Sequence, residues 1–102
     1  MTAAAEPRGV RELREIDAVF DALAHPARRA ILQVLNARGT MTAGALAERF
    51  SCAWPTTTRH LGVLREAGLV RVEPRGRERH YSVEVGTLST AIDRFLRPFG
   101  AS

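Results

Sequence analysis

Lysine is absent from this 102-residue chain, and cysteine, tyrosine and tryptophan each occur once. The single cysteine, Cys52, excludes an internal disulfide and fits a reducing compartment. The sequence contains no run of about 18 apolar residues that could span a bilayer, and its first residues contain no apolar stretch of signal-peptide length. We therefore expect a soluble, cytoplasmic protein that does not associate with a membrane.

The charge is distributed unevenly along the chain. All 15 basic side chains are arginines, and they face 11 acidic residues, which gives a net charge of +4. Residues 28–79 contain ten arginines and four glutamates, a net +6, whereas residues 1–27 contain three arginines and five acids, a net −2. Scattered arginines are often simply exposed to solvent, so the inference rests on the clustering of arginines in residues 28–79. A basic central segment indicates a polyanionic partner.

The length of the chain allows one domain. Residues 1–9, which include Pro7 and Gly9, are expected to form a disordered tail, and residues 10–100 a single domain. The chain is 45% hydrophobic, which suffices for a core, but a chain this short buries a modest share of its surface. Pairing with a second copy would therefore add stability.

Apolar residues at helical spacing predict helices in both halves of the chain. Their expected ranges are residues 10–24, 26–38, 43–50, 55–67 and 88–99. Pro26 suits the first turn of the second helix, and Thr42 is a good N-cap for the third. Gly39 and Gly68 are expected to end the second and fourth helices.

The periodicity changes to two after Gly68. Val70 and Val72 alternate with charged residues, a turn is predicted at residues 74–77, and an extended pattern resumes over residues 81–83. These features predict a β-hairpin with an arginine-rich tip. The fold class is therefore expected to be mainly α with a small β-hairpin, a winged helix-turn-helix that dimerises through its N- and C-terminal helices.

The predicted helix over residues 55–67 has one polar side and one apolar side, as a helix that reads a DNA groove requires. A helix in the major groove exposes short polar side chains near its N-terminus and buries its opposite face. Leu61 and Leu64 provide the buried side, and Arg59 can pair with a guanine edge, while arginines at the hairpin tip can reach phosphate or the minor groove. We predict that double-stranded DNA is bound by Trp54, Pro55, Thr56, Thr57, Thr58, Arg59, His60, Arg75, Arg77 and Arg79.

Several stretches form a combined pattern: Ala22-Leu23-Ala24-His25-Pro26-Ala27-Arg28-Arg29-Ala30-Ile31-Leu32, Leu46-Ala47-Glu48, Thr58-Arg59-His60-Leu61 and Glu66-Ala67-Gly68-Leu69-Val70. This pattern, within residues 15–84, resembles the ArsR/SmtB family of dimeric repressors. The resemblance implies a recognition helix over residues 55–67, a wing over residues 70–83, and a homodimeric repressor on a palindromic promoter site. The expected dimer interface consists of Val10, Leu13, Ile16, Phe20, Leu88, Ile92, Phe95, Leu96 and Phe99.

The sequence departs from that family where its metal-responsive members bind metal. Such members carry paired cysteines near the third helix, or His and carboxylate pairs on the last helix. Here Cys52 has no neighbouring cysteine, and the last helix carries Asp93 without a histidine. We therefore expect neither a metal nor a cofactor.

His25 is expected to cap the second helix or to pack against it. Gly62 replaces a frequently basic residue, which leaves more of the phosphate binding to Arg59 and the wing.

Two other functions remain open at this point. The basic face could bind an acidic protein surface, or the same fold could be a redox- or ligand-gated sensor that uses Cys52 or a pocket at the dimer interface. The identity of any small-molecule or metal effector stays open as well. An enzyme is not expected, because Ser51, Cys52 and His60 come without a motif that supplies an aligned base or an oxyanion hole.

Overall fold

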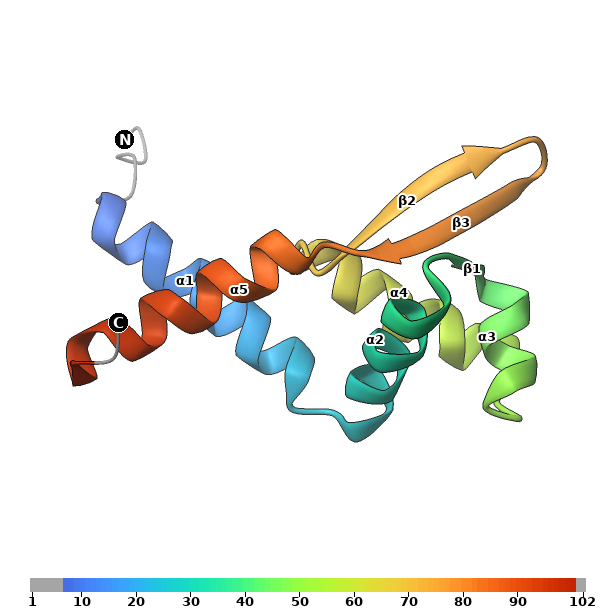
Figure 1. Ribbon diagram of the computed structural model, residues 1–102, viewed down its shortest axis with the longest axis horizontal. Coiled ribbons are helices and arrows are strands. Elements are labelled where there is room, and N and C mark those ends of the chain that lie inside the picture. Colours follow the sequence, from blue (N-terminus) through green and yellow to red (C-terminus); the bar gives the residue numbers. More distant parts are fainter. Residues whose placement is uncertain (1–6, 101–102) are drawn as a thin grey trace, which may run out of the picture.

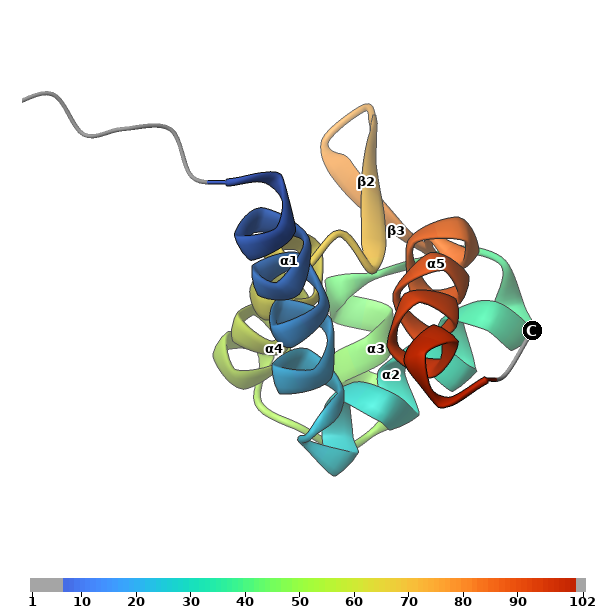
Figure 2. The same cartoon turned by 90° about the vertical axis from the view of Figure 1, so that its left-hand side faces the viewer.

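The computed structural model describes residues 7–100, which fold into a helical body with a projecting hairpin (Figure 1). The helices are α1 (Arg8–Leu23), α2 (Pro26–Arg38), α3 (Ala43–Arg49), α4 (Trp54–Glu66), α5 (Val85–Leu96) and the short 3-10 helix η1 (Arg97–Phe99). The strands are β1 (Met41–Thr42), β2 (Val70–Arg75) and β3 (Glu78–Val83). Figure 1 shows α1 and α5 at one end of the molecule and the tip of the β2–β3 hairpin at the other, and Figure 2 views the molecule from the end that carries α1 and α5.

A leucine core joins these elements. The side chains with no exposed surface at its centre are Leu35, Leu46, Leu61, Leu64 and Leu69. Val19 and Ala22 of α1, together with Ala91 of α5, close the same core from the side of the terminal helices. Burial of each leucine side chain stabilises the folded state by about 1.5–3 kcal/mol. Because Leu61 and Leu64 are both anchored here, the side of α4 that faces outward is fixed.

The predicted helix ends are largely confirmed. The Thr42 hydroxyl accepts a hydrogen bond from the Ala45 amide at 3.1 Å, and His25 Nδ1 accepts one from the Ala27 amide at 3.2 Å. Pro26 begins α2, and Gly39 follows it with a φ of 87°. In contrast, α1 begins at Arg8, so residues 8 and 9 are helical rather than part of the predicted tail. Residues 1–6 of that tail lie outside the described residues.

The sheet contains a strand that the periodicity did not predict. Its order is β1-β3-β2, with both pairings antiparallel, and Met41 of β1 lies opposite Tyr81 of β3. A strand of two residues is too short to show an alternating pattern. The hairpin itself is confirmed, and its two-residue turn has a positive φ of 62° at Gly76, as in a type II′ turn. The strand β1 ties the base of the wing to the start of α3.

Two arginines from the basic central segment hold the end of α1. Arg28 Nε donates to the Ala22 carbonyl at 2.6 Å, and Arg28 Nη2 donates to the Asp21 carbonyl at 3.0 Å. Arg29 Nη1 donates to the Leu23 carbonyl at 2.7 Å. The last carbonyls of a helix lack partners within the helix, so these bonds satisfy them. Both arginines therefore serve the α1–α2 junction.

Candidate nucleic-acid interface

The first two turns of α4 present the predicted reading residues in different environments. Pro55 and Arg59 are exposed, and Trp54 is 58% exposed. Thr57 is only 2% exposed, and its hydroxyl donates to the Ala53 carbonyl at 3.2 Å. The predicted contact between Thr57 and DNA is therefore wrong, because this position belongs to the inward side of the helix together with Leu61.

The N-terminus of α4 is open toward solvent. Thr56 and Thr58 are half-buried, and the Thr58 hydroxyl donates to the Trp54 carbonyl at 2.7 Å, which leaves its oxygen free to accept. The N-cap residue, Ala53, provides no side-chain cap for the first amides. An uncapped helix N-terminus carries partial positive charge and favours phosphate. This end of α4 is therefore suited to a DNA backbone.

His60 lies against α2. Its ring packs on that of His25, with centroids 4.6 Å apart and an interplanar angle of 57°. Its Nδ1 atom is buried and has no hydrogen-bond partner among the described residues. The structure thus places the half-buried His60 ring in the contact between α2 and α4, and its contact with DNA stays a prediction.

The His25–His60 contact gives the fold a pH dependence. Burial lowers the pKa of His60 below its ordinary value, and the charges of His25, Arg28 and Arg59 lower that pKa further. Stability is therefore fully present above the unfolded pKa of about 6.5 and decreases as the pH falls through the lower folded pKa. We expect the melting temperature of His60→Phe, which keeps a ring at this contact, to fall less than that of the wild type between about pH 7.5 and about pH 5. Equal decreases in the two proteins would show that His60 contributes no such dependence.

The wing arginines point to opposite faces of the hairpin. Pro74 lies opposite Arg79 and Val72 opposite Tyr81, so Arg79 shares the face of Tyr81 that is turned toward the body. Arg75 lies on the other face, where its Nη2 is 3.5 Å from Glu73 Oε2 in an exposed ion pair. Arg79 therefore lies on the face of the wing that is turned toward α4, and Arg77 lies in the turn.

A hollow separates the wing from the start of α4. Its volume is 420 Å³, and its lining includes Trp54 and Thr58 from α4 and Arg77, Glu78, Arg79 and Tyr81 from the hairpin. Two guanidinium groups and one carboxylate of the wing therefore border it. Four of the predicted DNA-binding residues therefore meet around one concave surface. Arg75 is not among its lining residues, in keeping with its position on the opposite face.

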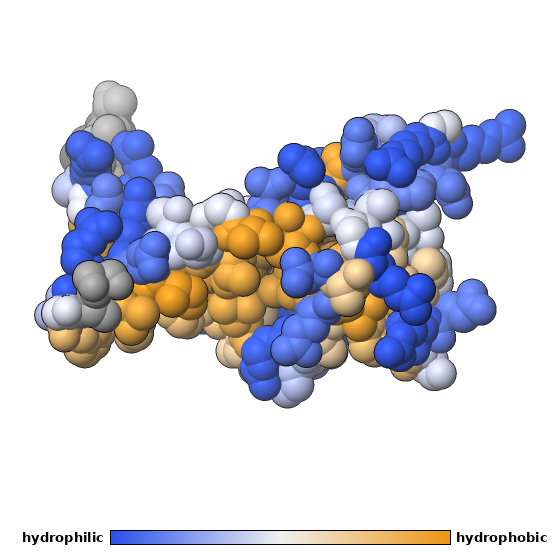
Figure 3. Space-filling view, in the orientation of Figure 1, coloured by the Kyte–Doolittle hydropathy of each residue, from blue (hydrophilic) through white to orange (hydrophobic). Residues whose placement is uncertain are grey.

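The terminal helices expose several large apolar side chains, which together we call the terminal-helix face. It consists of Val10 (46% exposed), Leu13 (62%), Phe95 (46%), Leu96 (39%) and Phe99 (73%), together with the half-buried Phe20 and Ile92. The rings of Phe20 and Phe95 are 5.0 Å apart, and those of Phe95 and Phe99 are 5.4 Å apart. Figure 3 shows hydrophobic surface along α5 toward its C-terminal end. Exposed apolar patches of this kind mark interaction surfaces.

Two predicted interface residues lie elsewhere. Leu88 packs against the core, and Ile16 lines a groove between α1 and α5. Both are half-buried, so they contribute less to the terminal-helix face than their neighbours do. Helical spacing alone does not distinguish the flank of a stripe from its centre.

The other candidate chemistry is sparse. Cys52 is a free, half-buried thiol in the turn between α3 and α4, where its amide donates to the Ala47 carbonyl at 2.9 Å. Among residues 7–100, no three His, Cys, Asp or Glu side chains gather as they would around a metal ion. Within the same part of the chain, no helix has both the length and the apolarity to cross a bilayer.

Known proteins share this arrangement. Residues 23–73 match a family described as a helix-turn-helix domain. The chain is 36% identical over 78 residues to the transcriptional repressor SdpR of Bacillus subtilis, and the aligned region covers 76% of this chain and 86% of that protein. It is 32% identical to the ArsR-like transcriptional regulator from Rhodococcus sp. RHA1, with a TM-score of 0.76 over 86% of this chain and 81% of that one.

A third protein shares the fold. The solution structure of a homodimeric winged helix-turn-helix DNA-binding domain, Mb0332 from Mycobacterium bovis, superposes with a TM-score of 0.75 at 23% identity, covering 95% of this chain and 90% of that one. The predicted fold class is thus confirmed, and the sequence identities above extend the likeness from fold to family. The chain belongs to the ArsR family of winged helix-turn-helix transcriptional regulators, which bind DNA.

Proposed function

We propose that this DNA-binding regulator is a repressor that acts as a homodimer on a palindromic duplex. In this arrangement α4 of each protomer enters a major groove, and the wing holds the adjacent backbone. The observation that carries the proposal is the division of α4, whose inward side is locked by Leu61 and Leu64 while Arg59 stands exposed on the opposite side. Because the partner is duplex DNA, we infer that the protein acts in the cytoplasm.

Arg59 is the proposed reader of sequence. It lies on the outward side of α4 between Pro55 and Gly62, and the space beside Gly62 is open. With no bulky side chain next to it on that side, the helix can approach the base edges closely. A guanidinium can donate two hydrogen bonds to O6 and N7 of guanine. Thr56, half-buried one turn earlier, is proposed to contact the flank of the groove.

The hollow between α4 and the wing is proposed to hold the sugar-phosphate backbone. Arg77 and Arg79 supply the positive charge on one side, and the uncapped first turn of α4 supplies it on the other. Trp54 is positioned to pack on a sugar, and the Thr58 oxygen remains available as an acceptor. Arg75 contributes less in this proposal, because it is paired with Glu73 on the opposite face.

The terminal-helix face is the proposed homodimer interface. The related M. bovis domain is homodimeric, and the exposed aromatic cluster here would otherwise remain in water. A two-fold axis through this face would present two copies of α4 to successive major grooves, roughly 34 Å apart. Such a dimer covers promoter DNA and excludes polymerase, in keeping with the repressor name of the B. subtilis relative.

Selection of genomic fragments by the purified protein tests this function. We expect the selected fragments to share a palindrome, and affinity for it to fall linearly with salt on logarithmic scales, by about 0.9 in slope for each phosphate neutralised. Arg77→Ala and Arg79→Ala should each reduce that slope, by about one for every contact removed. The matched control is Arg11→Ala, an exposed arginine in the first turns of α1. A protein-interaction module would instead select no duplex even at low salt.

A further inference from the structure

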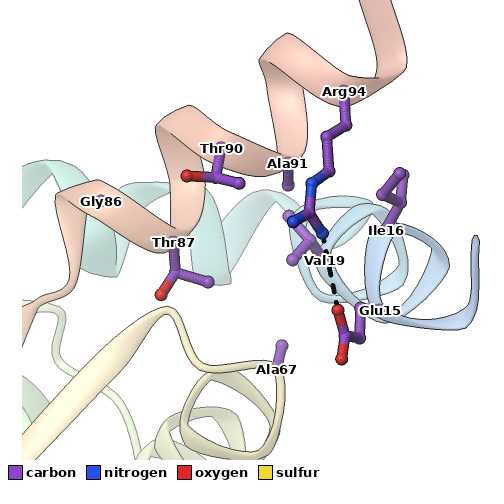
Figure 4. A pocket seen from close by; sticks show the side chains of 9 residues that line it. All are labelled: Glu15, Ile16, Val19, Ala67, Gly86, Thr87, Thr90, Ala91 and Arg94. Atoms are coloured by element: carbon purple, nitrogen blue, oxygen red, sulfur yellow. Dashed lines mark ion pairs between the residues drawn. The ribbon is translucent and has the colours of Figure 1, made fainter. Parts of the chain in front are cut away.

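A groove runs between α1 and α5, and its outer part borders the terminal-helix face at Leu13. Its deeper part has a volume of 360 Å³ and is bounded by Ile16 and Val19 of α1, Ala91 of α5 and Ala67 at the end of α4 (Figure 4). A second part, of 510 Å³, continues along the same helices and shares Ile16, Thr90 and Arg94 with the first. Volumes of this size are typical of sites for small organic molecules.

The groove combines an apolar floor with a cationic wall. Arg94 Nη1 lies 3.7 Å from Glu15 Oε2, a single long contact, and Arg94 is 37% exposed. Glu12 is engaged by Arg8 at 3.3 Å. Arg97 lines the outer part and has no ion pair with any described residue. The three arginines therefore outnumber the two glutamates, and most guanidinium donors of Arg94 and Arg97 remain available.

We propose that this groove binds an amphipathic organic carboxylate. Its hydrocarbon part lies on Ile16, Val19 and Ala91, and its carboxylate is held by Arg94 and Arg97. Arginine pairs with carboxylate through parallel hydrogen bonds, so the charge fixes the orientation while the floor selects an apolar body. A neutral or cationic molecule of the same shape lacks the first of these interactions.

The deeper part of the groove stays open in the proposed dimer. On α1, the deeper part of the groove is lined by Glu15 and Val19, whereas the terminal-helix face carries Val10. Leu13 belongs to the terminal-helix face and also lines the outer part of the groove. On α5, the groove side carries Thr87, Thr90 and Arg94, and the apolar face carries Ile92 and Phe95. Glu15 and Val19 lie on the opposite side of α1 from Val10, and the two sets on α5 likewise lie on opposite sides, at 3.6 residues per turn. A ligand in the deeper part of the groove therefore does not compete with the second copy.

The deep end of the groove reaches the recognition helix. Ala67 is the C-cap of α4, and Gly68 follows it with a φ of 76°. A Cβ added at Gly68 would lie 3.3 Å from Thr87 Cγ2, so α5 packs directly on the backbone at this helix end. A ligand seated against Ala67 and Thr87 therefore changes how α4 is held relative to the helices of the dimer face. We expect this coupling to alter DNA affinity by about 5- to 150-fold, the usual range for linked sites.

Direct binding tests the site without DNA. The probe is octanoate, titrated into the isotope-labelled full chain and followed by NMR, with octanol and octylamine as matched comparisons. We expect shifts concentrated at Thr87, Thr90 and Ala91, and affinity for octanoate at least tenfold higher than for the other two. Arg97→Gln and Thr90→Leu should each lower octanoate affinity at least tenfold, whereas Arg11→Gln should leave it unchanged. Equal binding of octanol, or full affinity in Arg97→Gln, would overturn the proposal.

The regulatory part rests on the proposed function and has its own readout. Octanoate should change the affinity of the wild type for its selected duplex at least fivefold and have no such effect on Thr90→Leu. If octanoate binds and duplex affinity stays constant, the coupling to α4 is refuted although the site is real. If no duplex binds even without octanoate, the proposed function fails, while the binding data still decide on the groove.

Discussion

Leu13→Asp combined with Phe99→Asp should convert the protein to monomers and weaken binding to the palindromic duplex by about 100-fold or more. Leu13 is 62% exposed and Phe99 is 73% exposed, so neither substitution removes a contact from the core. In the dimer, each new carboxylate would be buried in an apolar interface without a partner, which is strongly unfavourable. A monomer engages one half-site and loses the high effective concentration of the second reading helix. Sedimentation equilibrium and fluorescence anisotropy measure the two effects.

The control is Gln33→Asp, which adds one negative charge, as each of the two substitutions does, at an exposed position of α2. This variant should remain dimeric and keep its DNA affinity. Circular dichroism establishes that the double variant is folded. A double variant that still sediments as a dimer would show that protomers associate through some other surface.

Arg59→Ala should abolish the preference for the palindrome over a scrambled duplex. A guanidinium that donates two hydrogen bonds to guanine contributes about 1–3 kcal/mol of discrimination at each half-site, and the dimer loses two such contacts. Arg59 is exposed, so the change removes no packing from α4. Competition titrations with both duplexes in the same salt measure the preference directly.

Arg59→Lys separates reading from charge. Lysine retains the positive charge but lacks the planar fork of donors, so this variant should bind the scrambled duplex nearly as well as the wild type and discriminate poorly. Arg11→Ala should leave both affinities unchanged. If Arg59→Ala still distinguishes the palindrome fully, another residue reads the bases.

The elements with strong periodicity could be predicted from the sequence. The inward stripe of Leu61 and Leu64 fixed the outward side of α4, and the caps at His25 and Thr42 follow from local chemistry. Thr57 illustrates a conflict between two signals. It fitted the inward stripe and also the polar N-terminus expected of a reading helix, and burial in the core prevailed.

Pairings between distant residues could not be predicted in this way. The contact between the rings of His60 and His25 depends on how α2 crosses α4, and no local pattern encodes that crossing. In the wing, Arg75, Arg77 and Arg79 would share one face of an uninterrupted strand. The two-residue turn resets this alternation, because Pro74 rather than Arg75 pairs with Arg79. The groove between α1 and α5 likewise exists only where residues far apart in sequence meet.

The bonds from Arg28 and Arg29 to the end of α1 have a consequence for operator architecture. They restrain the junction between α1, which carries part of the proposed dimer interface, and the body that carries α4. The two copies of α4 in a dimer would then be separated by a fixed distance and a fixed rotation. One inserted base pair turns the second half-site by roughly 35° about the duplex axis. Two copies of α4 in a fixed arrangement could not then contact both half-sites. Genuine operators should accordingly share a single spacer length, however much their bases vary.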